Sequence, residues 1–287
     1  MPPVKIFIDS AFRRDGSFSN FSFQLPRPFD VQKQYKAMVD QVHIPHTFPT
    51  ITANNRALYL DEEYEDAANP PASIQRQRKV LLAEGQYSGD QLATELQTKL
   101  QTGTNIPGGT YTVTFDADQG KLSFTIAGGG SAVVRLLPME FLLRDRAYFT
   151  DFLGAALIPH DDAGSVIGLF GDARRAFAHT DTSAMTLGHI SALPFHVLYL
   201  HCDQGLGTGE DAIGPRGNGT ILRSIPVTTA YGQMLHDLSL NPHDHTIIHK
   251  GQVQTFRFRL ADGFGRDVPL DQPFSFSILL TPVDELE

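Results

Sequence analysis

Among the residues of this chain, the histidines between positions 243 and 249 best match the residue types and the spacing of metal ligands. His243 and His245 are two residues apart, so on a β-strand both side chains would point to one face and could bind the same ion. His249 follows in the same segment. A complete motif of this kind also needs a carboxylate shortly afterwards and a further histidine on a later strand, but no histidine follows His249. We therefore interpret the three residues as part of a polar loop or an interface strand.

The spacing of the other groups of reactive side chains matches known functional motifs less well. The acidic run Asp61–Asp66 could bind calcium, but it lacks the alternating spacing and the glycine turn of a calcium loop, which favours a solvated rim. His43 and His46 are three residues apart and would not share one strand face. Cys202 lies in an apolar segment predicted to be a strand, where no neighbouring residue indicates that its thiol is reactive. We predict no catalytic, cofactor-binding or metal-binding residues, and no cofactor.

The composition limits the classes of function. The chain has 287 residues, 41% of them hydrophobic, which allows one large β domain or two smaller ones. A net charge of -9 argues against a protein that coats a nucleic-acid backbone, and the short basic run Arg76–Lys79 is expected on a solvated face. The lone Cys202 excludes an intrachain disulfide. The N-terminus lacks the pattern of a signal peptide, and no apolar run reaches the ~18–20 residues of a membrane span.

The elements that would position these residues are mostly strands. Apolar side chains recur at every second residue in many segments; Phe274, Phe276 and Ile278, for example, share one face. This alternation is typical of strands with one buried face. Proline-containing breaks such as Leu25–Pro28 separate the segments. About ten such segments with turns between them predict an all-β, antiparallel sandwich.

One region departs from the strand pattern. Ser88 is expected to cap a helix over Gly89–Gln101, with three leucines at a spacing of four residues. A hairpin follows, with a loop that ends at Gly120, and together they predict a helix-plus-hairpin insertion at about 85–130. A second short helix is expected near Pro138–Leu143. The segments 150–188 and 205–219 are predicted to be long loops.

The opening of the chain provides a resemblance to a known family. The segment Phe7–Phe21 resembles the "IDS-x-R-x-x-G-S-x-S-x-F" start of penton-like and minor capsid proteins in polinton-like viruses, virophages and related large DNA viruses. Further segments are similar to the same proteins: Val42–Ile51, Ala83–Ser88, Tyr111–Asp116, Phe152–Gly154 and Phe256–Pro269.

The resemblance implies a jelly-roll β-sandwich, with residues 1–287 forming a single domain that carries the insertion. It implies a non-enzymatic virion protein, a penton subunit that forms a homopentamer at the capsid vertex. Its expected partners are further copies of itself, the major capsid protein and other minor capsid proteins, with no direct contact to nucleic acid and no membrane span. Such a protein is made and assembled inside the host cell and is located in the virion.

Three alternatives remain open. The first is a minor capsid or cement protein of the same virions. The second is a receptor-binding fibre or attachment module, which would also be rich in β-strands and without enzymatic activity. The third is a metal-dependent, cupin-like enzyme that uses His243, His245 and His249.

Overall fold

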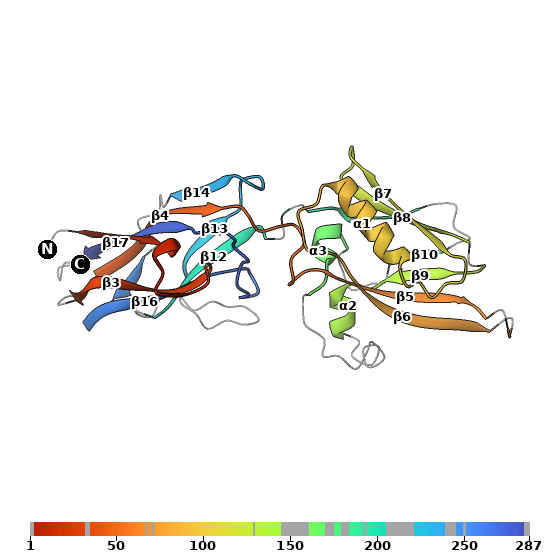
Figure 1. Ribbon diagram of the computed structural model, residues 1–287, viewed down its shortest axis with the longest axis horizontal. Helices are drawn as coiled ribbons and strands as arrows, with labels where there is room; N and C mark the ends of the chain where they lie inside the picture. The colour runs from red at the N-terminus through yellow and green to blue at the C-terminus, as the bar shows by residue number, and fades with distance from the viewer. Residues whose placement is uncertain are drawn as a thin grey trace. The chain divides into compact units, whose positions relative to one another are not determined.

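The chain divides into two compact units (Figure 1). The terminal unit contains Met1–Phe48 and Phe195–Glu287, and the inserted unit contains Pro49–Pro194. The computed structural model describes the following residues: 3–31, 35–66, 68–69, 72–128, 130–144, 161–169, 175–178, 184–191, 193, 195–204, 221–238, 245–248 and 251–283.

The terminal unit contains two antiparallel sheets. The first sheet has the order β1-β17-β4-β14, with β15 also paired to β4. The second sheet has the order β13-β12-β16-β3-β2. The bounds in the first sheet are β1 (Val4–Asp9), β4 (Tyr35–Pro45), β14 (Met234–Leu238), β15 (Thr246–Ile248) and β17 (Ser275–Pro282). Those in the second are β2 (Asp15–Gly16), β3 (Asn20–Val31), β12 (Val197–Gln204), β13 (Ile221–Pro226) and β16 (Gly251–Ala261).

The order of pairing defines a jelly roll. Without the short strands β2 and β15, the described residues of this unit form eight main strands. The first main strand pairs with the last, β1 with β17, and the pairs β3–β16, β4–β14 and β12–β13 follow in the same nested order. The chain therefore folds as one long hairpin rolled into two sheets, which confirms the predicted jelly-roll sandwich.

Phenylalanines fill the space between the two sheets. Phe258 on β16 contacts Phe276 on β17 edge to face, with ring centroids 4.9 Å apart. Phe21 on β3 contacts Phe274, which precedes β17, in the same way at 5.8 Å. All four side chains are at most 2% exposed. The two-residue alternation in the sequence thus places one face of each of these strands in a shared core.

The described part of the inserted unit contains two further antiparallel sheets and three helices. One sheet has the order β10-β9-β5-β6, and the other has the order β11-β8-β7. The bounds of the first are β5 (Ala57–Glu65), β6 (Ser73–Leu81), β9 (Val133–Leu136) and β10 (Arg175–Ala178). The remaining elements are α1 (Gly89–Gln101), β7 (Thr110–Asp116), β8 (Lys121–Ala127), α2 (Met139–Arg144), α3 (Gly164–Ile167) and β11 (Met185–His189).

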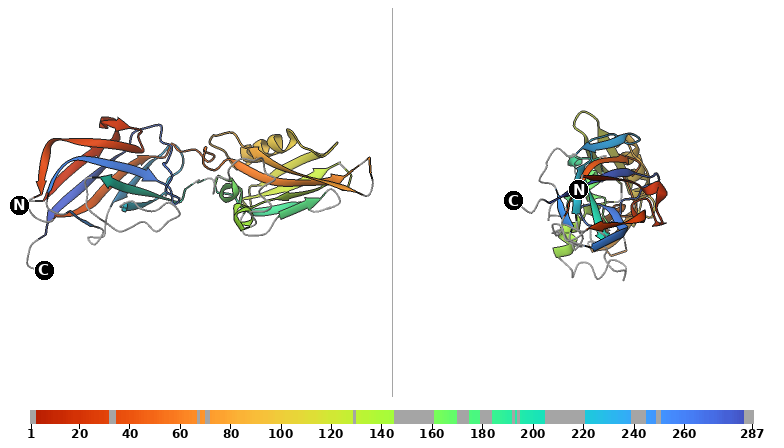
Figure 2. Two further views of the ribbon diagram at one scale, coloured as in Figure 1. Left: turned by 90° about the horizontal axis from the view of Figure 1, so that it is seen from below. Right: turned by 90° about the vertical axis from the view of Figure 1, so that its left-hand side faces the viewer.

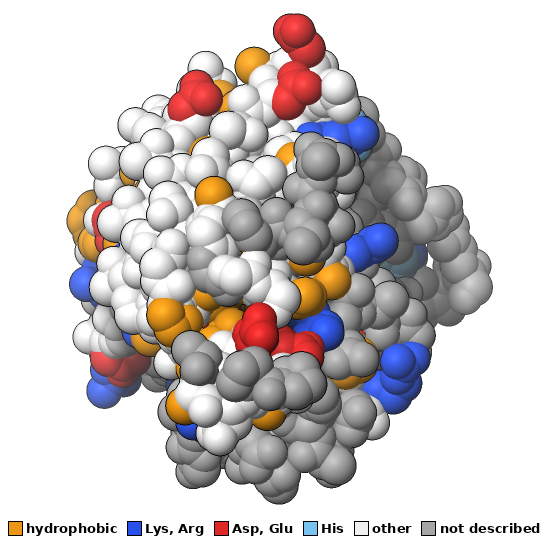
Figure 3. Space-filling model, turned by 90° about the vertical axis from the view of Figure 1, so that its right-hand side faces the viewer, with side chains coloured by type: hydrophobic (Ala, Val, Ile, Leu, Met, Phe, Trp, Pro, Cys, Tyr) orange, Lys and Arg blue, Asp and Glu red, His pale blue; other side chains and the backbone are white. Residues whose placement is uncertain are grey.

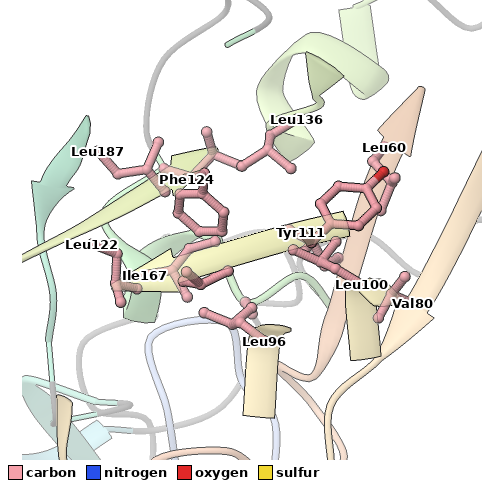
Figure 4. Close-up of a cluster of buried hydrophobic side chains, with 14 of the residues drawn as sticks. Leu60, Val80, Leu96, Leu100, Tyr111, Leu122, Phe124, Leu136, Ile167 and Leu187 are labelled. Atoms are coloured by element: carbon pink, nitrogen blue, oxygen red, sulfur yellow. The ribbon is translucent and has the colours of Figure 1, made fainter. Parts of the chain in front are cut away.

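Helix α1 begins and packs as its sequence predicts. The Ser88 hydroxyl accepts a hydrogen bond from the Gln91 amide, and the Gln91 side chain accepts one from the Ser88 amide, which forms a capping box. Leu92, Leu96 and Leu100 are at most 2% exposed. They belong to one apolar cluster with side chains from both sheets of this unit, shown in Figure 4. The predicted hairpin is also confirmed as β7 and β8, and the short predicted helix as α2.

Two expectations about this region differ from the structure. The insertion is not limited to about 85–130, because the helix and hairpin share a core with β5, β9 and β11 and so belong to a unit that spans Pro49–Pro194. Within the predicted loop 150–188, the described residues form β10, β11 and α3. β10 and β11 are short outer strands of their sheets, so their pairing with β9 and β8 defines them more than their own residue pattern does.

Candidate interaction surfaces

Most exposed large apolar side chains among the described residues lie in the terminal unit. Two of them, Phe7 and Phe12, are 67% and 78% exposed and lie on β1 and on the turn that follows it. Met234 and Leu238 are 44% and 59% exposed and lie on β14. β1 and β14 are the two ends of the first sheet. Exposed apolar side chains at sheet edges are typical of surfaces that contact another protein.

An open groove lies beside the β1 edge. Its volume is about 330 Å³. Phe7 and Phe12 line it together with Phe23 from β3, while His43 and Gln41 from β4 contribute polar atoms. The groove therefore combines side chains from β1, β4 and β17 of the first sheet with one from β3 of the second. Its apolar character fits a protein side chain or segment better than a charged small molecule.

The β14 edge presents a second apolar strip. Met234 and Leu238 are each two residues from His236, so the three side chains point to the same face of the sheet. Tyr231 precedes the strand and is 47% exposed. The partner of His236 across the sheet is His43 on β4. Figure 2 shows the terminal unit in two further views.

The two histidines meet on the surface of the first sheet. Their Nδ1 atoms are 2.6 Å apart, and their ring centroids are 4.9 Å apart at an interplanar angle of 75°. A hydrogen bond at this distance requires one ring to donate from Nδ1 and the other to accept there. Partial burial lowers the pKa of His43, and the neighbouring His236 lowers it further. Sequence reasoning missed this pair because 193 positions separate the two residues.

His46, the histidine considered together with His43 in the sequence, has a different environment. His46 lies three residues further on, is buried, and places its Nδ1 atom 2.8 Å from the Thr229 carbonyl oxygen. Its ring stacks on Phe48 at 4.2 Å. His46 thus has a packing role and does not share a face with His43.

In the inserted unit, the first two residues of the acidic run, Asp61 and Glu62, are buried instead of solvated. Glu62 is 0% exposed. One of its oxygens accepts hydrogen bonds from the Tyr111 hydroxyl at 2.6 Å and the Thr104 hydroxyl at 3.1 Å. The other accepts from the amide and side chain of Asn105 at 2.9 and 2.8 Å. The Arg78 guanidinium lies 3.3 Å from the first oxygen. Protein donors thus surround this carboxylate, which has a structural role.

Arg78 connects this carboxylate to the end of α1. Its guanidinium donates to the carbonyl oxygens of Leu100 at 2.6 Å and Thr102 at 3.1 Å. These carbonyls belong to the last turn of the helix, where backbone acceptors lack helical partners. The expectation of a solvated face for the run Arg76–Lys79 is therefore wrong for Arg78, and Lys79 forms an ion pair with Asp161 at 2.9 Å.

A second group of carboxylates lies at the beginning of β5. Asp161 accepts a hydrogen bond from the Tyr59 hydroxyl at 2.9 Å as well as contacting Lys79. Burial and the carboxylate of Asp161 raise the pKa of Tyr59. Burial also raises the pKa of the adjacent Asp162 to about 6, with a further contribution from Glu140. Each of these groups has a neighbour from the same unit.

The position of β5 explains why its acidic residues are buried. β5 lies between β6 and β9 in its sheet. Leu58 and Leu60 on one face belong to the main cluster of the unit, and Tyr59 on the other face packs with residues of α2. Both faces of the strand are therefore covered, and Asp61 is 0% exposed like Glu62. The hypotheses of a solvated rim and of a calcium loop are both wrong for these two residues.

The remaining candidates of the sequence are only partly described. His245 is half-buried and directly precedes β15, whereas His243 and His249 lie outside the described residues. The predicted loop 205–219 and the motif Phe152–Gly154 also lie outside them. Within the described part of the chain, no three His, Cys, Asp or Glu side chains are grouped as metal ligands would be. The described helices include none that is both long enough and apolar enough to cross a membrane.

The charged side chains are distributed in small groups on the face drawn in Figure 3. Lys and Arg side chains lie apart from one another there, with acidic and apolar side chains between them. The described side chains on this face form no continuous basic stripe of the kind found in proteins that follow a nucleic-acid backbone.

Comparison with known proteins adds one finding about the fold. Neither a family model nor a curated protein matches the sequence. Among solved structures, the chain is similar to the crystal structure of the mavirus penton protein. The two chains superpose with a TM-score of 0.53 and are 11% identical, over 99% of this chain and 100% of the other. The two proteins share a fold. At 11% identity the similarity shows a shared architecture only, and individual residues of the two proteins cannot be equated.

Proposed function

We propose that this chain is a structural protein of a viral capsid and that it acts as a penton subunit. Three observations support the proposal: the jelly-roll topology of the terminal unit, the fold shared with the mavirus penton protein over nearly the whole length of both chains, and the apolar sheet edges. The shared fold carries the most weight. The proposed location is the virion, after assembly inside the host cell, and the proposed role involves no catalysis.

The apolar edges fit a closed ring of subunits. A ring is built from heterologous contacts, in which each subunit needs two different and complementary patches. β1 with Phe7 and Phe12, and β14 with Met234 and Leu238, lie at opposite ends of one sheet. We assign these two edges to the contact between neighbouring copies in a homopentamer. Other surfaces remain for the major capsid protein and other minor capsid proteins as further partners.

The experiment measures the mass of the assembly for the purified chain and two double variants. We expect wild-type protein to give the mass of five chains in native mass spectrometry. Phe7→Ser with Phe12→Ser removes the apolar patch of the β1 edge, and Met234→Ser with Leu238→Ser removes that of the β14 edge. Each double variant should be monomeric, because it lacks one of the two patches.

Mixing the two variants tests the heterologous geometry. The β14 edge of the first variant and the β1 edge of the second are both intact, so an equal mixture should form dimers that contain one copy of each, and no rings. Leu81→Ser is the matched control, since Leu81 is 44% exposed but lies on β6 of the inserted unit. The Leu81→Ser variant should form an assembly of the same mass as wild type.

Other masses would support other functions. A trimer would favour a fibre or attachment module over a penton. A wild-type chain that is monomeric at high concentration and absent from purified virions would overturn the proposal of a capsid protein. A chain present in virions but away from the fivefold vertices would favour a minor capsid or cement protein.

A further inference from the structure

The outer face of the first sheet carries two imidazoles in chelating position. His43 lies on β4 and His236 lies directly opposite it on β14. Their Nδ1 atoms face one another at 2.6 Å. Directly opposed residues of an antiparallel pair have Cβ atoms about 4.5–5.5 Å apart, which lets two ring nitrogens reach one ion. We propose that His43 and His236 form a binding site for a transition-metal ion of the Zn²⁺, Cu²⁺ or Ni²⁺ class.

The chemistry of the donors selects this class of ion. Imidazole nitrogen suits Zn²⁺, Cu²⁺ and Ni²⁺, whereas Ca²⁺ and Mg²⁺ prefer oxygen ligands. A tetrahedral ion with Zn–N distances of ~2.0–2.1 Å places its two nitrogens about 3.3 Å apart. The observed separation of 2.6 Å therefore has to open by less than an ångström. His236 is exposed, so a small rotation of its side chain accomplishes this without a backbone shift.

The sheet holds the backbone of both residues. β4 is an inner strand, paired with β17 on one side and β14 on the other. The register around the pair is regular, since Leu235 opposes Ile44 and Asp237 opposes Val42. Leu235, Ile44 and Val42 are fully buried in the core. The two histidines thus project outward from a rigid base, and only their rings must move when an ion binds.

The site has two protein ligands, so the remaining positions of a four-coordinate ion are left to water. It lies on the same face as Met234 and Leu238, two residues away along β14 on either side. A bound ion would therefore add a positive charge to the strip that we assign to subunit contact. The metal site itself depends only on the geometry of the two histidines and stands without the proposed penton function.

Titration of tag-free protein with ZnCl₂ at pH 7.5, followed by isothermal calorimetry, tests the site. The variants are His43→Gln and His236→Gln, with His196→Gln as the matched control because His196 is an exposed histidine of the same unit. All three variants keep His243, His245 and His249. We expect each ligand variant to lose one Zn²⁺ equivalent per chain or to bind it more weakly by at least about tenfold. The control should retain it.

A second readout identifies the ligands directly. With one equivalent of Cu²⁺, electron paramagnetic resonance of wild-type protein should show coupling to two imidazole nitrogens, reduced to one or none in either ligand variant. Circular dichroism of each variant verifies that the sheet is folded. Equal Zn²⁺ affinity and stoichiometry in wild type and both ligand variants would overturn the proposal, as would a wild-type chain that binds no Zn²⁺. Neither result would bear on the capsid function, which the mass measurements test.

Discussion

Replacing Glu62 by Gln should strongly destabilise the inserted unit. Both Glu62 oxygens accept hydrogen bonds, one from Tyr111 and Thr104 and the other from Asn105 twice. A glutamine has one oxygen and one NH₂ group, so its NH₂ group must face either the backbone N–H of Asn105 or the guanidinium of Arg78, and neither of these can accept a hydrogen bond. The substitution also removes the negative charge opposite Arg78 while both side chains stay buried.

The magnitude follows from the burial of the pair. Glu62 is 0% and Arg78 11% exposed at the side chain, so water cannot replace the lost partner. Breaking a buried pair on one side costs about 3–5 kcal/mol. For a unit of this size, 1 kcal/mol corresponds to about 2–4 °C in Tm, so we expect Glu62→Gln to lower the melting temperature by roughly 10 °C.

Glu63→Gln is the matched control, one residue further along the same strand. Glu63 forms its ion pair with Arg135 at 2.7 Å and is 32% exposed at the side chain. Its hydrogen bond with Arg135 lowers its pKa, but pairs of this exposure contribute only about 0–1 kcal/mol. Calorimetric melting measures both variants, and hydrogen exchange of the α1 amides localises the effect, because Arg78 also holds the end of that helix. A Glu62→Gln variant that melts within 2 °C of wild type, as the control should, would refute the assignment of Glu62 as a structural carboxylate.

Two further substitutions test the inserted unit. Asp162→Asn should stabilise the chain at pH 7.5 by about 1–3 kcal/mol, because the pKa of Asp162 is raised from 3.8 to about 6 in the folded state. Between pH 3.8 and about 6 the folded wild type binds more protons than the unfolded chain, so its unfolding free energy falls as the pH rises. Urea unfolding at pH 4.5 and 7.5 should show this fall in unfolding free energy in wild type and not in the variant. Leu96→Ala removes a fully buried side chain of α1 and should cost about 2–5 kcal/mol. Thr98→Ala is the control, because Thr98 is exposed and its hydroxyl bonds only within the helix, and equal urea midpoints for the two variants would contradict the packing of α1.

Local signals in the sequence were sufficient for the elements that depend on neighbouring residues. The helix Gly89–Gln101 is specified by its cap at Ser88 and by the leucine spacing, all within fourteen residues. The hairpin loop is specified by Gly120, whose φ of 63° requires a residue that tolerates the left-handed region. The alternation of apolar residues predicts strands but not which strands pair, so the jelly roll is an expectation from the family resemblance alone.

The sites depend on contacts that no local pattern contains. Glu62 looked like part of a solvated acidic run because its partner Tyr111 lies 49 positions away. His43 looked isolated for the same reason, as His236 is brought to it only by the pairing of β4 with β14. The extent of the inserted unit was underestimated because its core joins the helix to strands on both sides of it in sequence. In each case the sheet order decides the environment of the residue.

The point of insertion explains how a jelly roll can hold a second unit of this size. The inserted unit follows β4 and precedes β12, the third and fourth main strands of the roll, and thus replaces one loop between them. Phe48, which directly precedes the inserted unit, and Phe195, which directly follows it, both belong to the terminal unit, and their ring centroids are 5.7 Å apart. The two connections therefore leave the sandwich side by side, and a unit that begins and ends at one place leaves the strand pairs on either side unchanged. The stacking of His46 on Phe48 anchors the first connection to the sheet. A long insertion at this position is thus compatible with an intact sandwich, because Phe48 and Phe195 lie in contact at its boundary and the strand pairs that define the roll lie outside it.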